Sequence, residues 1–136
     1  EKKLFFCDSK KSSVSVFDYE KKTGEISNRK IILQTLRSES GSSDGLCIDS
    51  NDNIWVGRWD GSTIVQIDQN GRELQKIHFP TKKITTLCFG GKYLNDIYIN
   101  SAGGDDIQQN GQLAGSLFQL RLRIKGKYEY RSRFDN

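Results

Sequence analysis

The chain repeats one pattern of paired short strands, and this repeat restricts the folds open to it more than any other feature. The segment KLFFCDSKKSSVSVFDYEKKTGE aligns with NIWVGRWDGSTIVQIDQNGRE, and Leu4–Phe6 lies 50 positions before Ile54–Val56. A third copy begins at DIYINSAGG, where Ile97 follows Ile54 by 43 positions. A period of about 40–50 residues built from short strands is typical of a β-propeller, in which each repeat forms one blade.

The local patterns also indicate a chain made of strands. Short runs rich in Val, Ile, Phe, Tyr and Trp are separated by turn segments such as KKTGE, DQNG and FGGK, where Gly and Asn supply positive φ angles. No stretch of ten or more residues shows a helical apolar period. The sequence therefore predicts an all-β fold with strands at Lys3–Cys7, Ser13–Tyr19, Arg29–Leu33, Gly45–Ile48, Ile54–Arg58, Thr63–Ile67, Glu73–His78, Thr85–Phe89, Ile97–Asn100 and Ser116–Ile124.

The length of the chain limits how much of a propeller it can form. At this period, 136 residues supply under three blades, whereas a closed ring typically has 4–8 blades. Two or three blades leave sheet edges open to pairing with other chains. We therefore expect residues 1–136 to be the C-terminal portion of a single β-propeller domain, with the remainder of the ring upstream or in another chain. We expect this portion not to fold alone.

Composition and charge exclude several classes of protein. Hydrophobic residues make up 35% of the chain and charged residues 28%, which suits a globular protein with a core. The longest apolar runs, such as IWV, are far shorter than the roughly 20 residues of a membrane-spanning helix. The net charge of +4 is scattered, and Arg121 and Arg123 alternate along a predicted strand, as on a solvated face. We expect neither a membrane nor a nucleic acid as a partner.

The cysteines and the single histidine restrict the chemistry. Cys7, Cys47 and Cys88 each lie inside an apolar stretch, and an odd number in such settings predicts buried, reduced thiols and a cytoplasmic protein. His78 is the only histidine, and it alternates with apolar residues on a predicted outer strand, so we expect it to be structural. We therefore expect no zinc finger and no Cys–His or Ser–His catalytic pair within this chain.

Three acidic turn sites follow one another in the stretch GSSDGLCIDSNDNIWVGRWDGSTIVQIDQNG. The first, Asp44, follows the small residues GSS and precedes the apolar run GLCI. In a propeller, the loop that enters a first strand faces the central channel, where a carboxylate is a suitable ligand for Ca²⁺ or Zn²⁺. A turn aspartate that bonds to its own backbone is the alternative interpretation, and the residues alone leave both open.

The other two acidic sites are interpreted as turns between strands of one blade. Asp49, Asn51 and Asn53 occupy positions 1, 3 and 5 of a calcium-loop pattern, but position 6 is Ile54 where such a loop requires Gly. The third site, Asp60-Gly61, separates two strand patterns and predicts a hairpin turn.

Arg58 and Trp59 end the strand that precedes this hairpin. They could line the mouth of the channel, but we favour a solvated Arg58 and a Trp59 that packs between blades. Ser101–Gly104 follows another strand, and its small residues permit close packing or loop movement without matching a phosphate-binding motif.

The same segments, in the same order, resemble a known family. The segments KLFFCDSKKSSVSVFDYEKKTGEISNRK, SDGLCIDSNDNIWVGRWDGSTIVQID, KITTLCFGGKYLNDIYINSAGG and GSLFQLRLRIKG are similar to the C-terminal half of the SMP-30/gluconolactonase/regucalcin family, which includes the insect luciferin-regenerating enzyme. The resemblance implies a six-bladed propeller with one divalent cation at its channel, often Ca²⁺ or Zn²⁺, with Mg²⁺ and Mn²⁺ as alternatives. It also implies the hydrolysis of sugar lactones.

The resemblance gives a role to one residue of this chain. The family's metal-binding and catalytic aspartate matches Asp44, which implies that Asp44 is a ligand of the cation and a candidate general base. The family's other ligands, a Glu and an Asn, and its substrate-contacting Arg and Asn lie upstream of the matching segment. The chain departs from the family at Ser43, where a Pro commonly precedes Asp-Gly, so the backbone before Asp44 is less restricted.

The chain is therefore expected to be part of a divalent-metal-dependent lactone hydrolase. Activity on a small-molecule lactone is expected once the missing N-terminal half completes the propeller, and the chain alone is expected to be inactive. The alternative is a non-catalytic propeller used for calcium binding or protein interaction, because one fold serves many functions. Upstream Glu, Asn and Arg residues would favour the enzyme, and their absence would favour the binding role.

Overall fold

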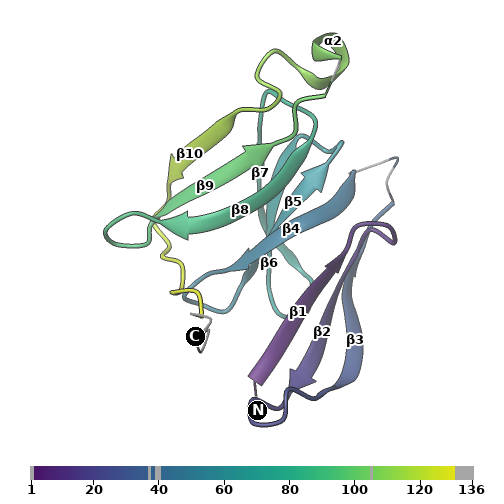
Figure 1. Cartoon of the computed structure of the whole chain (residues 1–136), viewed down its shortest axis with the longest axis vertical. Coiled ribbons are helices and arrows are strands. Elements are labelled where there is room, and N and C mark those ends of the chain that lie inside the picture. Colours follow the sequence, from purple (N-terminus) through teal and green to yellow (C-terminus); the bar gives the residue numbers. More distant parts are fainter. Residues whose placement is uncertain (1, 37, 39–40, 105, 131–136) are drawn as a thin grey trace, which may run out of the picture.

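The computed structural model describes residues 2–36, 38, 41–104 and 106–130, and these residues form three antiparallel sheets (Figure 1). The N-terminal sheet has the strand order β1–β2–β3, the central sheet β4–β5–β6–β7 and the C-terminal sheet β10–β9–β8. The strands are β1 (Lys2–Asp8), β2 (Ser13–Tyr19), β3 (Ile26–Gln34), β4 (Ser42–Ile48), β5 (Ile54–Trp59), β6 (Thr63–Ile67), β7 (Glu73–His78), β8 (Ile84–Gly90), β9 (Asp96–Ser101) and β10 (Leu117–Arg121).

The predicted strands are confirmed, and β2, β6 and β7 have the predicted bounds at both ends. Most of the others extend one to three residues beyond the predicted ends, because cross-strand hydrogen bonds recruit polar residues that apolar periodicity does not mark. The strand predicted at Ser116–Ile124 is instead shorter: β10 ends at Arg121, which pairs with Asp96, the first residue of β9. The short helix α2 (Ile107–Asn110), between β9 and β10, was not predicted, since four residues carry no helical period. In the described ranges, no helix is long and apolar enough to cross a membrane.

The sequence repeat corresponds to equivalent strands. β1 and β2 of the N-terminal sheet match β5 and β6 of the central sheet 50 residues later. The registers match as well, because Phe6 pairs with Ser15 in the first sheet and Val56 pairs with Val65 in the second. By the same comparison, β4 and β8 are the first strands of their sheets. β1 corresponds to β5, a second strand, and it forms the edge of its own sheet.

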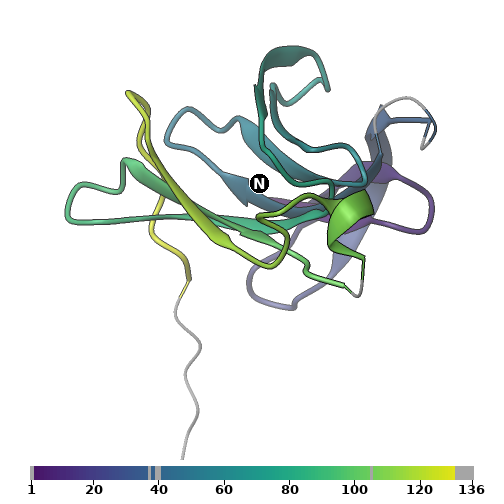
Figure 2. The ribbon, with the colours of Figure 1, turned by 90° about the horizontal axis from the view of Figure 1, so that it is seen from above.

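The central sheet lies between the other two. β4 contacts β1 on one side and β8 on the other, and Figure 1 shows it running between them. Seen from above, the three sheets fan out from the middle of the molecule, with α2 nearest the viewer (Figure 2). The first strands β4 and β8 therefore lie against each other near the middle, as the inner strands of propeller blades do around a channel, whereas β1 corresponds to the second strand β5 and contacts β4.

Both faces of the central sheet are buried. Trp55, which is fully buried, packs with Ile84 on the side of the C-terminal sheet, whereas Ile54 and Val56 pack with Val14 on the side of the N-terminal sheet. Successive side chains of a strand point to opposite faces, so a strand that is covered on both sides has an unbroken apolar run. This packing explains the sequence IWV at the start of β5.

Two glycines allow the sheets to lie close together. A Cβ atom at Gly45 would lie 2.6 Å from Thr86 Cα and 2.7 Å from Thr85 O, and one at Gly57 would lie 3.0 Å from the same carbonyl oxygen. The backbone of β8 therefore lies directly against β4 and β5, where a larger residue would separate the strands.

We expect Gly45→Ala to lower the free energy of unfolding by about 2 kcal/mol, because the added methyl group must push β8 away from β4. Gly103→Ala is the matched control, since a Cβ atom there would meet only Gly115 Cα at 3.8 Å. The control should change stability by no more than about 0.5 kcal/mol. Urea unfolding of the protein with its complete propeller, followed by tryptophan fluorescence, measures both variants, and equal stabilities would contradict the close approach at Gly45.

Candidate functional site

Asp44 lies within β4 rather than in the loop before it, which corrects the expected position. The strand begins at Ser42, and its pairing with β5 is interrupted by a β-bulge between Ser43 and Leu46. The apolar pattern in the sequence did not mark this earlier start, because the first residues of the strand are small and polar. A bulge takes residues out of the regular ladder and changes the direction of their side chains. Asp44 therefore lies on a strand, but its side chain does not follow the regular alternation of side chains between the two faces of the sheet.

Hydroxyl groups of the β1–β2 turn hold this segment. Ser9 Oγ donates a hydrogen bond to Asp44 Oδ1 at 3.2 Å, and Ser42 Oγ donates to the carbonyl oxygen of Ser9. The amide of Ser43 donates to Ser12 Oγ at 3.3 Å. These contacts join the end of β1 to the start of β4, which lie side by side in Figure 1. The N-terminal sheet therefore sets the position of Asp44.

The Asp44 carboxylate suits a cation as one ligand. Its side chain is partly exposed, and its only hydrogen bond within the described residues comes from Ser9. Oxygen lone pairs therefore remain for a hard cation such as Ca²⁺. No group of three or more His, Cys, Asp or Glu residues in the described ranges could hold a metal ion. The residues present fit a metal site to which this chain contributes one carboxylate.

Arg58 is buried, with 3% of its surface exposed, so the expectation of a solvated side chain is wrong. Its Nη1 donates to Ser43 Oγ at 2.5 Å and to Thr35 Oγ1 at 3.0 Å. Ser43 and Arg58 are cross-strand partners, so their side chains point to the same face, toward the N-terminal sheet. The sequence did not reveal this burial, because an arginine at a strand end ordinarily reaches water.

Trp59 and Asp60 follow Arg58 at the end of the β5–β6 hairpin. Asp60 is exposed and has a φ angle of 61°, which confirms the predicted turn. Trp59 is partly buried, and the Lys83 ammonium lies 5.2 Å from the centre of its ring. Lys83 directly precedes β8, so Trp59 faces the C-terminal sheet, as the prediction of packing between blades requires. His78 is exposed on β7, the outer strand of its sheet.

The thiols near the site are not nucleophiles. Burial, and then the Asp44 carboxylate, raise the pKa of the Cys7 thiol to about 12, and burial raises the pKa of the Cys47 thiol well above its ordinary value. Both thiols are therefore neutral at physiological pH. Of the three thiols expected to be buried, only Cys47 is; Cys7 is partly buried and Cys88 is exposed. Leu87 takes the buried side of β8 instead of Cys88. All three cysteines are free.

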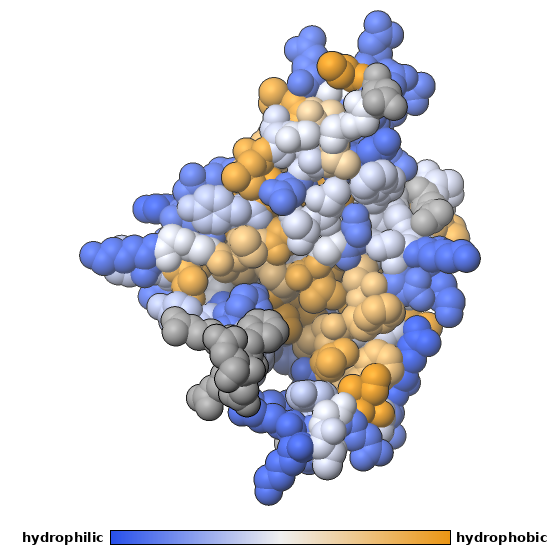
Figure 3. Space-filling model, viewed as in Figure 1, coloured by the Kyte–Doolittle hydropathy of each residue, from blue (hydrophilic) through white to orange (hydrophobic). Residues whose placement is uncertain are grey.

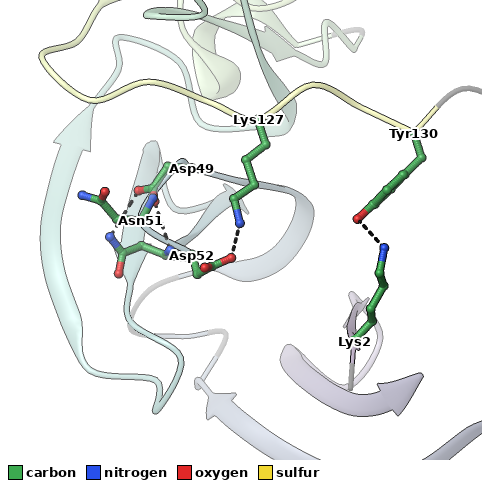
Figure 4. Close-up of polar contacts among 7 residues, drawn as sticks. Lys2, Asp49, Asn51, Asp52, Lys127 and Tyr130 are labelled. Atoms are coloured by element: carbon green, nitrogen blue, oxygen red, sulfur yellow. Dashed lines mark hydrogen bonds and ion pairs between the residues drawn. The ribbon is translucent and has the colours of Figure 1, made fainter. Parts of the chain in front are cut away.

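The second acidic site is buried and structural. Asp49 is fully buried, and its carboxylate accepts hydrogen bonds from the amides of Asn51 at 2.9 Å and Asn53 at 3.0 Å. It also accepts from Trp55 Nε1 at 3.0 Å and Gln66 Nε2 at 2.7 Å. Donors occupy its oxygen atoms, so it has no place for a cation, and the turn interpretation is confirmed (Figure 4). The sequence did not reveal the donors from β5 and β6, which meet Asp49 only after the strands pair.

The C-terminal segment covers the turn that contains Asp49 and reaches the start of β1. The amide of Ser50 donates a hydrogen bond to the carbonyl oxygen of Lys125 at 2.7 Å. Asp52 also pairs with Lys127, and Lys2 Nζ donates to Tyr130 Oη at 3.4 Å (Figure 4). Because Lys2 begins β1 and Ser9 follows its end, this segment lies at the opposite end of the strand from Asp44. The candidate site and the C-terminal segment are therefore separate features.

The fold and the position of Asp44 define a class of protein. Antiparallel sheets with one repeated register, arranged around a common middle, are the blades of a β-propeller, and an acidic side chain at the start of a first strand suits a site at its channel. The chain belongs to the family described as SMP-30/gluconolactonase/LRE-like, which matches residues 1–103. The resemblance inferred from the sequence is confirmed.

Known relatives cover the chain almost completely. Pentonolactonase XacC of Haloferax volcanii is 33% identical over 137 residues, covering 96% of this chain and 47% of that protein. Regucalcin of Gallus gallus is 36% identical over 130 residues, covering 92% of this chain and 43% of that protein. The structure of a calcium-binding protein, regucalcin, from Agrobacterium tumefaciens matches with a TM-score of 0.86 at 25% identity, covering 97% of this chain and 46% of that one. The chain thus spans less than half the length of these relatives.

We expect Asp49→Ala to destabilise the protein by roughly 3 kcal/mol or more, because it leaves the Trp55 indole and the Gln66 amide buried without an acceptor. Asp68→Ala is the matched control. Asp68 also accepts hydrogen bonds from two turn amides, at 2.8 and 3.0 Å, but it is partly exposed, so its loss should cost about 1 kcal/mol. Chemical unfolding measures both, and a smaller loss for Asp49→Ala than for Asp68→Ala would contradict the assignment.

Proposed function

We propose that this chain is part of a divalent-metal-dependent lactone hydrolase in which Asp44 is a ligand of the cation and the general base. The observation that carries the proposal is the partly exposed Asp44 carboxylate at the bulge of β4, where the first strands meet near the middle of the propeller. The identity of 33% to a pentonolactonase supports a lactone as the substrate.

The residues around Asp44 suit this chemistry. Ser9 Oγ donates to Asp44 Oδ1 at 3.2 Å and so orients the carboxylate. The carboxylate can accept a proton from the water molecule that attacks the lactone carbonyl carbon. The ring C–O bond then breaks, the leaving oxygen takes the proton back from the carboxyl group, and the product is a hydroxy acid. A divalent cation, when bound, supplies Lewis-acid polarisation of the carbonyl and stabilises the negative charge on its oxygen.

Ca²⁺ or Zn²⁺ is the proposed cation, with Mg²⁺ and Mn²⁺ as alternatives. A carboxylate oxygen suits all four ions, and Ca²⁺ takes 6–8 oxygen ligands. The described residues supply one carboxylate, so we assign the remaining ligands to the part of the protein outside this chain. The calcium-binding protein from Agrobacterium tumefaciens, with its TM-score of 0.86, supports a cation in the same class of fold.

The remaining half of the propeller is the proposed partner of this chain, whether it belongs to the same chain or a separate one. β1 is an edge strand, so one side of it is open to pairing. Apolar side chains gather across the middle of the face shown in Figure 3, where β1, β4 and β8 lie, and Phe6 of β1 is 50% exposed. We propose that the remaining half pairs with β1 and covers this face, and that the lactone binds in the channel so formed.

A cytoplasmic location follows from the same proposal. The three free cysteines suit a reducing compartment. We assign no role to a membrane or a nucleic acid, because the charge of +4 is scattered along the chain.

A calcium-binding propeller without hydrolytic activity is the second candidate function. The similarity to the Agrobacterium tumefaciens structure, which is that of a calcium-binding protein, favours it. Both candidates use Asp44 as a cation ligand, and only the first requires hydrolysis. The two are therefore separated by measuring cation binding and lactone hydrolysis on the same preparation.

We expect Asp44→Asn to lower kcat/KM for lactone hydrolysis by roughly 10²–10⁴-fold, because an amide cannot serve as a general base. The affinity for the cation should fall as well, because the amide carries no negative charge. Asp60→Asn is the matched control, an exposed aspartate whose positive φ angle suits Asn, and it should keep wild-type activity.

Acid release from a sugar 1,5-lactone and a pentonolactone, followed in a pH-stat, measures hydrolysis in these variants, and calorimetric titration with Ca²⁺ and Zn²⁺ measures cation binding. Unchanged hydrolysis in Asp44→Asn would sink the assignment of Asp44. Wild-type protein that binds the cation but hydrolyses no lactone would favour the second candidate.

We expect the isolated 136-residue chain to show no lactone hydrolysis, because one carboxylate does not hold a divalent ion and the apolar face stays uncovered. Adding the remaining half of the propeller should restore both activity and about one cation per ring. Native mass spectrometry and metal analysis of the purified assembly check this expectation. A folded, active chain of 15.5 kDa with no partner would contradict it.

A further inference from the structure

Arg58 is a buried cation without a carboxylate partner in the part of the chain that the structure describes. Its Nη1 donates to the hydroxyl oxygens of Ser43 and Thr35, and its Nε, also buried, has no hydrogen-bond partner there. Removing a charged group from water costs several kcal/mol unless it is well paired. An apolar side chain of the same length would therefore pack more favourably, and the burial of Arg58 needs another explanation.

The hydrogen bonds of Arg58 lead to Asp44. Ser43 directly precedes Asp44, and Ser43 and Arg58 form the last regular pair before the bulge in β4. Between Ser43 and Leu46 the ladder is interrupted, so cross-strand pairing with β5 does not hold the backbone of Asp44. Arg58 itself sits on a strand that pairs on both sides, with β4 and with β6. The Arg58–Ser43 bond therefore connects a fixed strand to the start of an irregular one.

Thr35 and Ser12 complete a ring of hydrogen bonds around this connection. Thr35 Oγ1, which accepts from Arg58, lies 2.8 Å from Ser12 Oγ, and Ser12 Oγ accepts from the amide of Ser43 at 3.3 Å. A closed network restricts each member more than separate bonds would. The backbone that leads into Asp44 is thus held from β5 by Arg58 and from the β1–β2 turn by Ser12.

We propose that Arg58 is a positioning residue for Asp44: by holding Ser43 across the bulge, it sets the direction in which Asp44 presents its carboxylate to the cation and the substrate. This inference rests on the function proposed for Asp44. Arg58 touches neither cation nor substrate and acts through Ser43. The role accounts for a charged donor at a buried position where packing alone would favour an apolar residue.

The test begins with three variants of the protein with its complete propeller. Arg58→Met keeps the length of the side chain and removes its donors, whereas Ser43→Ala removes the acceptor and keeps Arg58. Gln66→Met is the matched control, because Gln66 is a buried polar residue of the same sheet, 5% exposed, whose hydrogen bond goes to Asp49 at 2.7 Å. All three should lower stability, so stability alone does not separate the explanations.

We expect Arg58→Met and Ser43→Ala each to lower kcat and cation affinity roughly 10–100-fold, which is the usual effect of losing a group that orients a ligand. The KM for the lactone should change by less than about 3-fold, because both variants keep the contacts that the protein makes with the lactone equally in the ground state and the transition state. The double variant should lose no more than Arg58→Met alone, since both changes remove one bond. Arg58→Lys should restore part of kcat, because its ammonium can still donate to Ser43 Oγ. Gln66→Met should keep wild-type kcat and cation affinity.

Several outcomes would overturn the positioning role. A Ser43→Ala variant with wild-type kcat and cation affinity would overturn it, even if Arg58→Met does not fold. Losses of kcat and cation affinity in Gln66→Met as large as those in the Arg58 and Ser43 variants would also overturn it, because destabilisation would then explain the effect. If the wild-type protein neither hydrolyses lactones nor binds a cation, the proposed function fails and the positioning role with it. If the wild-type protein is active and the Arg58 and Ser43 variants match it, only the positioning role fails.

Discussion

The contact of the central sheet with its two neighbours is the interaction on which the rest of the structure depends. β5 buries Trp55 toward the C-terminal sheet and Ile54 toward the N-terminal sheet, so apolar surface is removed from water on both faces. Gly45 and Gly57 allow the backbone of β8 to lie against β4 and β5. On the other side, packing against the N-terminal sheet brings the hydroxyl groups of the β1–β2 turn within hydrogen-bonding distance of the start of β4, where Asp44 lies.

The two ends of β4 carry acidic groups with opposite properties. Asp49, just after the strand, is surrounded by donors from its own turn and from β5 and β6, so hydrogen bonds occupy its oxygen atoms and the group is structural. Asp44, near the start, receives one hydrogen bond within the described residues and stays partly exposed. These two aspartates, five positions apart, therefore have different chemistry because they have different neighbours.

The chain belongs to the SMP-30/gluconolactonase/LRE-like family and spans less than half the length of its relatives. On the proposed function, the cation site is divided: this chain contributes Asp44, and the remaining half of the propeller contributes the other ligands. A site divided in this way forms only when the ring closes, so assembly and activity are coupled. The network of Arg58, Ser43, Thr35 and Ser12 then prepares one side of that site within the chain itself.

The sequence by itself determined the strands, the repeat and the turns, because side-chain alternation and positive-φ residues act over a few neighbouring positions. The residues alone left Asp44 open between a cation ligand and a turn aspartate, and only the family resemblance favoured the ligand. The bulge at Ser43, the burial of Arg58 and the donors around Asp49 were decided by the tertiary structure. Their partners lie far along the chain: 15 residues separate Arg58 from Ser43, and 35 separate Ser9 from Asp44. Such contacts exist only after the sheets pack, so no local pattern in the sequence records them.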